Sequence, residues 1–99
     1  MNRMDAIVSL NRHADAIRRM GATALYVYGS TARNAAHSAS DLDLFIDYDP
    51  ASRFNAFDLI DIKRMLEQAL ETPVDLTTRD GLHPLLRESI EQSAVRVFA

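Results

Sequence analysis

The stretch ALYVYGSTARNAAHSASDLDLFIDY, residues 24–48, contains two segments of β-forming residues separated by a polar loop. Its first five residues are predicted to form a strand, because aromatic and β-branched residues are enriched in strands. Gly29 and Ser30 end that strand, and we expect a short helix over residues 31–36 with Ser30 as its N-cap. The loop then leads into a second strand, expected over residues 41–48. The stretch therefore predicts a strand, a turn with a short helix, and another strand.

The rest of the chain alternates in the same way. Apolar residues at steps of three and four predict an N-terminal helix that ends before Gly21; they are Met4, Ile7, Leu10, Ala14 and Ile17. Further along, the pattern predicts a helix over residues 55–71, a strand over 74–77, a turn at 79–81, a helix from Pro84 to about Ser93, and a short strand over 95–98. This alternation indicates a single domain of the α/β or α+β class with a small sheet.

Composition limits the possible functions. The 99 residues suit one domain, and 47% hydrophobic with 25% charged residues is an ordinary globular composition. A net charge of −3 argues against direct nucleic-acid binding, which needs clustered Lys and Arg. The N-terminal twenty residues carry too many charges for a signal peptide or a membrane span. We therefore expect a cytoplasmic protein with no membrane partner, and the absence of cysteine excludes thiolate metal sites.

The second strand has one apolar and one acidic face. Side chains alternate across a strand, so Leu42, Leu44 and Ile46 share one face. Asp41, Asp43 and Asp47 share the other, with Phe45 among them. The third strand repeats this pattern, since Val74 and Leu76 alternate with Asp75 and Thr77. If the two strands are neighbours, Asp75 can approach Asp41 and Asp43.

Such a group of carboxylates suggests a cation site. Three close carboxylates repel one another unless a cation lies between them. Hard oxygen ligands without nearby His or Cys favour Mg²⁺. The alternative is that each aspartate only solvates an exposed face of the sheet.

Gly29 and Ser30 suggest an anion-binding turn. Glycine lets the backbone come close to a ligand, and a helix N-terminus offers free N–H groups to a phosphate. The alternative is an ordinary strand-to-helix turn capped by serine. An anion-binding turn followed ten residues later by paired carboxylates on a strand is what Mg²⁺-assisted nucleotidyl transfer requires.

These residues resemble the Gly-Ser … Asp-x-Asp signature of the polymerase-beta-like nucleotidyltransferases. The similarity is greatest to their minimal bacterial branch, the MNT domains, which act as antitoxins paired with HEPN-domain RNase toxins. It spans nearly the whole chain, because Asp75 matches the family's third carboxylate. The resemblance implies a small mixed sheet with helices packed on one face and a catalytic cleft on the other.

The resemblance also implies roles for individual residues. Gly29 and Ser30 would bind the nucleotide triphosphate, and Asp41 and Asp43 would ligate Mg²⁺. Asp75 would complete the metal site or act as a general base on the incoming hydroxyl.

Two loop positions carry less information. Arg33 matches a position that the family commonly fills with Arg, where it would contact phosphate or brace the acidic strand, although a solvated arginine is an equal alternative. Asn34 stands where the family often has Gly, and its tolerance of positive φ favours retention of the loop shape.

The resemblance implies a Mg²⁺-dependent nucleotidyltransferase that acts as an antitoxin. It would transfer AMP from ATP to a hydroxyl, that of a tyrosine, on a partner HEPN toxin. Two alternatives remain open: an antitoxin that acts by binding alone, and a nucleotidyltransferase that modifies a small molecule with a separate substrate-binding subunit. The nucleotide, the acceptor residue, the number of groups transferred and the homo- or hetero-oligomeric state are not indicated by the sequence.

Overall fold

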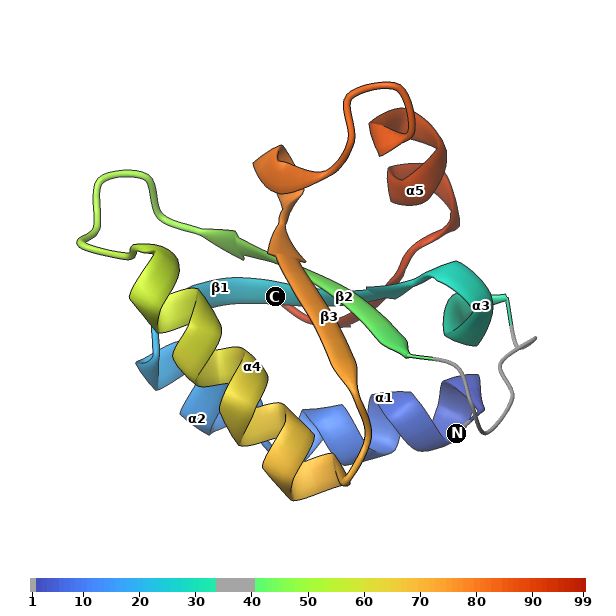
Figure 1. Ribbon diagram of the computed structural model, residues 1–99, viewed down its shortest axis with the longest axis horizontal. Coiled ribbons are helices and arrows are strands. Elements are labelled where there is room, and N and C mark those ends of the chain that lie inside the picture. The colour runs from blue at the N-terminus through green and yellow to red at the C-terminus, as the bar shows by residue number, and fades with distance from the viewer. Residues whose placement is uncertain (1, 34–40) are drawn as a thin grey trace.

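A four-stranded mixed sheet forms the centre of the computed structural model, which describes residues 2–33 and 41–99 (Figure 1). The strands lie in the order β3-β2-β1-β4. Their bounds are Ala22–Tyr28 for β1, Leu42–Tyr48 for β2, Val74–Thr78 for β3 and Val95–Phe98 for β4. The strand β1 is antiparallel to both of its neighbours, whereas β2 and β3 are parallel. A parallel pair requires a crossover, and α4 supplies it.

Three helices cover one face of this sheet: α1 (Arg3–Asn11), α2 (Ala14–Arg19) and α4 (Ala56–Leu70). The short helix α3 (Gly29–Ala32) follows β1 directly. The 3₁₀ turn η1 (Arg79–Gly81) and α5 (Arg87–Ser93) lie on the other side of the sheet (Figure 1). The predicted class, a small mixed α/β sheet with helices packed on one face, is confirmed. The helix α5 is an addition on the opposite side.

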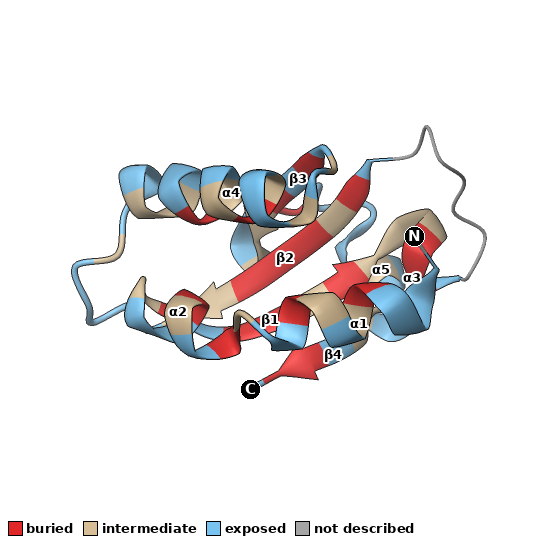
Figure 2. Ribbon diagram, turned by 90° about the horizontal axis from the view of Figure 1, so that it is seen from below, coloured by how far each residue is buried: buried red, intermediate tan, exposed pale blue. Residues whose placement is uncertain are grey.

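The core lies between the sheet and the three covering helices. Leu25 and Val27 of β1 and Leu44 and Ile46 of β2 have no exposed surface. Figure 2 shows these buried positions along β2 and on the inner sides of α1 and α4. Burying one such aliphatic side chain contributes about 1.5–3 kcal/mol. The alternation predicted for β2 is therefore the pattern that holds the sheet to its helices.

The predicted single N-terminal helix is wrong in one respect, because it is two helices. At the break the N–H of His13 donates to the carbonyl of Leu10, an i→i+3 bond that ends the first helix in a tight turn. The two parts pack on different elements: α1 contacts β4 and α3, whereas α2 contacts β1. A straight helix would not follow the twisted sheet across both contacts.

Two further predicted boundaries are wrong. The helix after β1 begins at Gly29 rather than residue 31, and Ser30 lies inside it, without a side-chain cap bond at the N-cap Tyr28. The final helix begins at Arg87 rather than Pro84, because a turn closed by a bond from the N–H of Leu86 to the carbonyl of His83 precedes it. The predicted strands at 74–77 and 95–98 and the helix at 55–71 are confirmed within one residue.

The ends of α4 determine where β3 begins. The helix starts with a capping box, in which the side chain of Asn55 accepts from the N–H groups of Phe57 and Asp58 while Asp58 accepts from the N–H of Asn55. After the helix, the carboxylate of Glu67 accepts from the N–H of Val74, the first residue of β3. The crossover therefore delivers β3 to a defined register beside β2.

None of the helices in the described part of the chain has the length and apolar character needed to cross a bilayer.

Asn55→Ala should lower the free energy of unfolding by about 1 kcal/mol, because it removes the acceptor for two N–H groups at the start of α4. Urea unfolding measures this loss, and Asn55→Ser, which keeps a capping oxygen, is the control. An equal loss in both variants would contradict the capping role.

Candidate functional site

The sheet register places three polar side chains in one row. Asp43 of β2 lies opposite Asp75 of parallel β3 and opposite Tyr28 of antiparallel β1. Their neighbours along the strands are buried in the core, so these three side chains lie on the face opposite α4. We call Tyr28, Asp43 and Asp75 the acidic row. The strands that carry Asp43 and Asp75 are neighbours, which is the condition under which the sequence allowed Asp75 to approach Asp43.

Asp41 lies beside this row rather than in it. It is exposed and comes immediately before β2, two residues from Asp43. In residues 2–33 and 41–99, no three Asp, Glu, His or Cys side chains are grouped so that they could hold a metal ion by themselves. The structure thus brings Asp43 and Asp75 together and leaves Asp41 at the edge of the pair.

The acidic row carries negative charge that Arg33 offsets only in part. Partial burial raises the pKa of Asp43 above its ordinary value, and the charges of Asp75 and Asp41 raise it further. The charge of Arg33 acts in the opposite direction. Burial, together with Asp43 and Asp75, raises the pKa of Tyr28 to about 12. Adjacent carboxylates that repel one another fit a hard divalent cation, which would remove the repulsion.

Gly29 joins the turn after β1 to the acidic row. Its φ of 71° lies in the left-handed region, where side chains are disfavoured. A Cβ at Gly29 would also collide with Oδ2 of Asp43, and Cγ of Asp43 would lie only 3.3 Å from it. Ser30 is half-buried in the helix that follows, and Arg33 is exposed at its C-cap. The turn at Gly29 is thus in direct contact with one of the predicted carboxylates, Asp43.

The prediction for Asn34 lies outside the described residues.

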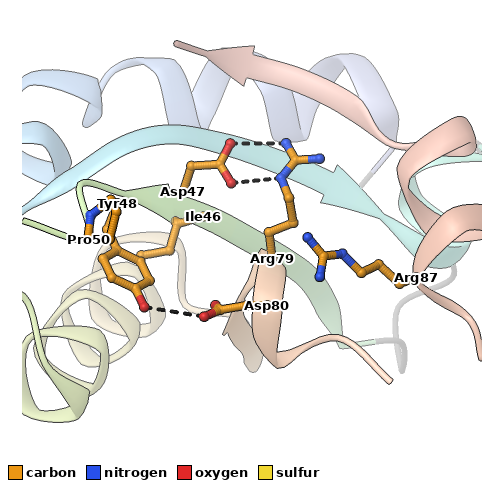
Figure 3. Close-up of a pocket in the computed structure, with 7 residues that line it drawn as sticks. All are labelled: Ile46, Asp47, Tyr48, Pro50, Arg79, Asp80 and Arg87. Atoms are coloured by element: carbon orange, nitrogen blue, oxygen red, sulfur yellow. Dashed lines mark hydrogen bonds and ion pairs between the residues drawn. The ribbon is translucent and has the colours of Figure 1, made fainter. Parts of the chain in front are cut away.

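Asp47 has a different environment, although it shares the face of Asp43. The guanidinium of Arg79 donates to it twice, from Nε to Oδ1 at 2.7 Å and from Nη2 to Oδ2 at 3.0 Å (Figure 3). These residues line a hollow of about 190 Å³ at the far end of β2 together with Ile46, Tyr48, Pro50, Asp80 and Arg87. The hollow contains none of the predicted site residues. Asp47 forms an ion pair with an arginine, whereas Asp43 is influenced by Arg33 without an ion pair within the described residues.

Sequence reasoning missed Tyr28 and Arg79. Tyr28 shares the outward phase of its strand and directly precedes Gly29, so its position in the acidic row could have been inferred once β1 was paired with β2. Arg79 was interpreted as part of a turn, because the side chains it contacts lie 32 and 12 residues away in the sequence.

Residues 10–97 match the nucleotidyltransferase domain family. The chain is also 35% identical over 72 residues to a candidate protein adenylyltransferase of Methanocaldococcus jannaschii, which covers 73% of this chain and 75% of the relative. The family match includes the acidic row and the turn at Gly29.

Solved structures show the same fold. A candidate minimal nucleotidyltransferase aligns with a TM-score of 0.81 at 30% identity, covering 96% of this chain and 95% of that one. A toxin–antitoxin complex with AMP-PNP contains a chain that aligns with a TM-score of 0.71 at 17% identity, covering 90% and 73%. A complex of a tri-AMPylated Shewanella oneidensis HEPN toxin with an MNT antitoxin gives a TM-score of 0.66 at 17% identity, covering 93% and 71%. At 17% identity, the last two support the fold alone.

Gly29→Ala should destabilise the protein by roughly 1–3 kcal/mol, the cost of a left-handed backbone at a non-glycine residue, with the collision against Asp43 added to it. Urea unfolding of Gly29→Ala, Asp43→Ala and the double variant measures both parts. The double variant should recover the part due to the collision. Strictly additive losses would contradict the contact between Gly29 and Asp43.

Asp43→Asn should raise the melting temperature of the metal-free protein at neutral pH. The folded-state pKa of Asp43 is raised, so its contribution to stability is favourable below the ordinary carboxyl pKa and is lost as the pH rises through the folded value. The gain should therefore disappear in acid. Asp47→Asn is the matched control on the same strand and should lower the melting temperature, because it removes the partner of Arg79. Shifts of the same sign in both variants, measured with EDTA present, would contradict this account.

Proposed function

Because this chain belongs to the nucleotidyltransferase domain family, we propose that it transfers AMP from ATP to a hydroxyl of a partner protein and thereby acts as an antitoxin. One observation carries the proposal. Gly29, which has no side chain, lies against Asp43, and Asp43 lies opposite Asp75. A site of this form can hold a nucleotide by its phosphates at one end and present carboxylates at the other.

Gly29 and Ser30 would hold the triphosphate. A phosphate can approach the backbone of Gly29 closely because no side chain intervenes. Arg33 is near enough for its positive charge to lower the pKa of Asp43. The same charge would attract the phosphates of the incoming nucleotide.

Asp41 and Asp43 would bind Mg²⁺, with Asp75 as a further ligand or as a base. Mg²⁺ is usually held by one or two carboxylates together with substrate phosphates rather than by a complete set of protein ligands. The paired row of Asp43 and Asp75, with Asp41 at its edge, is compatible with that mode of binding. When bound, the metal would offset charge on the α-phosphate and the leaving pyrophosphate.

The transfer would proceed by attack of the acceptor oxygen on the α-phosphorus. A bond forms between that oxygen and phosphorus, the bond to the bridging oxygen of pyrophosphate breaks, and the acceptor proton passes to Asp75. Asp75 suits this role because it is exposed on the open face, where an acceptor can reach it. Asp43 would thus help to hold the nucleotide through the metal, and Asp75 would accept the proton.

A HEPN-domain toxin is the partner that we propose. The relative from Methanocaldococcus jannaschii is named for adenylyl transfer to protein, and one structural neighbour is a complex with an AMPylated HEPN toxin. The acceptor would be a tyrosine, because a phenol with a pKa near ~10 ionises far more readily than an aliphatic hydroxyl.

Incubation of the chain with ATP, Mg²⁺ and a HEPN protein that forms a complex with it should add one or more AMP groups to that protein. Intact-mass spectrometry measures the increments, and fragmentation of the modified peptide locates the residue. Asp75→Ala should abolish the increments, whereas Asp61→Ala, on the outer side of α4, should not.

An unmodified partner, under conditions where the two proteins form a complex, would refute the transfer. If the double variant Asp41→Ala/Asp43→Ala then neutralises the toxin as well as wild type does, the chain acts by binding alone. Modification of a serine or threonine would refute only the tyrosine acceptor.

A further inference from the structure

Arg79 joins three elements that are distant in sequence. It belongs to η1, directly after β3, and its Nε and Nη2 donate to Asp47 of β2. Its Nη1 donates to Oε2 of Glu91 in α5 at 2.6 Å. The three side chains are only 27%, 31% and 32% exposed, so these ion pairs are partly shielded from water. Charge-assisted bonds of this length are among the stronger polar contacts in a protein.

The same guanidinium covers an aromatic group on the open face of the sheet. It lies 4.9 Å from the ring centre of Tyr26 and 5.0 Å from that of Phe45. Phe45 is fully buried although it faces away from the main core. Its ring stacks on Tyr26 at 4.7 Å and meets Tyr28 at 5.8 Å. Arg79 thus packs over the ring of Phe45, and Tyr28 of the acidic row packs against the same ring.

The position of α5 depends on this contact. None of the residues of α5 is buried, so the helix has little apolar contact to hold it. Glu91 receives bonds from both Arg79 and Arg87, but Arg87 belongs to α5 itself and does not connect the helix to the sheet through this pair. At its other side α5 contacts α3, the helix that contains Gly29 and Ser30 (Figure 1).

We propose that Arg79 is a positioning residue for the nucleotide site. Through Glu91 it holds α5 against α3, and through Phe45 it supports Tyr28 beside Asp43. Both connections end at the acidic row or at the turn that contacts it, so Arg79 fixes the phosphate-binding turn relative to the carboxylates. The inference rests on the proposed function, because it concerns the affinity for nucleotide.

Four variants separate this role from a general contribution to stability. Arg79→Met removes the ion pairs with Asp47 and Glu91 and keeps an apolar stem over the rings. Glu91→Gln weakens only the connection to α5. Arg79→Lys keeps the charge but cannot bind Asp47 with two bonds and Glu91 with a third. Arg87→Gln is the matched control, because it removes the exposed i,i+4 pair to the same Glu91 and leaves Arg79 in place.

Isothermal titration calorimetry with ATP and excess Mg²⁺ measures affinity, and hydrogen–deuterium exchange of the nucleotide-free protein measures order in α3 and α5. Arg79→Met should bind ATP about tenfold more weakly, a change of ~1.4 kcal/mol, with faster exchange in both helices. Arg79→Lys and Glu91→Gln should give intermediate losses of affinity. Arg87→Gln should resemble wild type in both measurements.

Wild-type affinity and wild-type exchange in Arg79→Met would overturn the inference. An equal loss in Arg87→Gln would also overturn it, because the effect would then belong to α5 as a helix and not to its link with the sheet. If wild type itself does not bind ATP, the proposed function fails. Glu91→Gln leaves the sheet contact of Arg79 intact. The hydrogen–deuterium exchange of α3 in this variant then decides alone whether Arg79 holds α5 against α3.

Discussion

The parallel pairing of β2 with β3 is the constraint on which the site depends. It places Asp43 beside Asp75, and the core makes that register hard to change. Leu42, Leu44 and Ile46 alternate with the acidic positions, so a slip of one residue would turn carboxylates into the core and apolar side chains into water. The bond from the N–H of Leu42 to the carbonyl of Pro73 starts the ladder at the same register. Packing energy thus maintains an electrostatically unfavourable pair.

Further along the same two strands, a carboxylate is paired with an arginine instead of with a second carboxylate. Four residues after Asp43 stands Asp47, and four residues after Asp75 stands Arg79. There the opposite charges meet in two hydrogen bonds, and the electrostatic cost is removed. Natural proteins commonly accept reduced stability where function requires it. The contrast between the two rows therefore distinguishes Asp47, which supports the fold, from Asp43, to which the proposed function assigns a chemical role.

The alternation of apolar and polar residues in the sequence predicted part of the site. Alternation in residues 41–48 and 74–77 identified Asp43 and Asp75 and their shared face, because the period of a strand is visible in the sequence. Their adjacency depended on strand order, which the sequence left open and the structure provides. The break near His13 and the start of α3 at Gly29 depend on packing against a twisted sheet and on one positive φ. Arg79 could not be assigned from sequence, because its partners lie on two other elements.

The negative charge of the acidic row also bears on the order in which Mg²⁺ and nucleotide bind under the proposed function. A nucleotide that arrives without a cation brings several negative charges to a turn in contact with Asp43. Burial first, and then the charges of Asp75 and Asp41, already raise the pKa of that carboxyl. A cation that arrives alone finds at most two or three carboxylates and no phosphate ligands. Each ligand therefore supplies what the other lacks. We infer that Mg²⁺ and nucleotide bind as one complex. Asp43 and Asp75 would then repel metal-free nucleotide and bind the nucleotide that carries Mg²⁺.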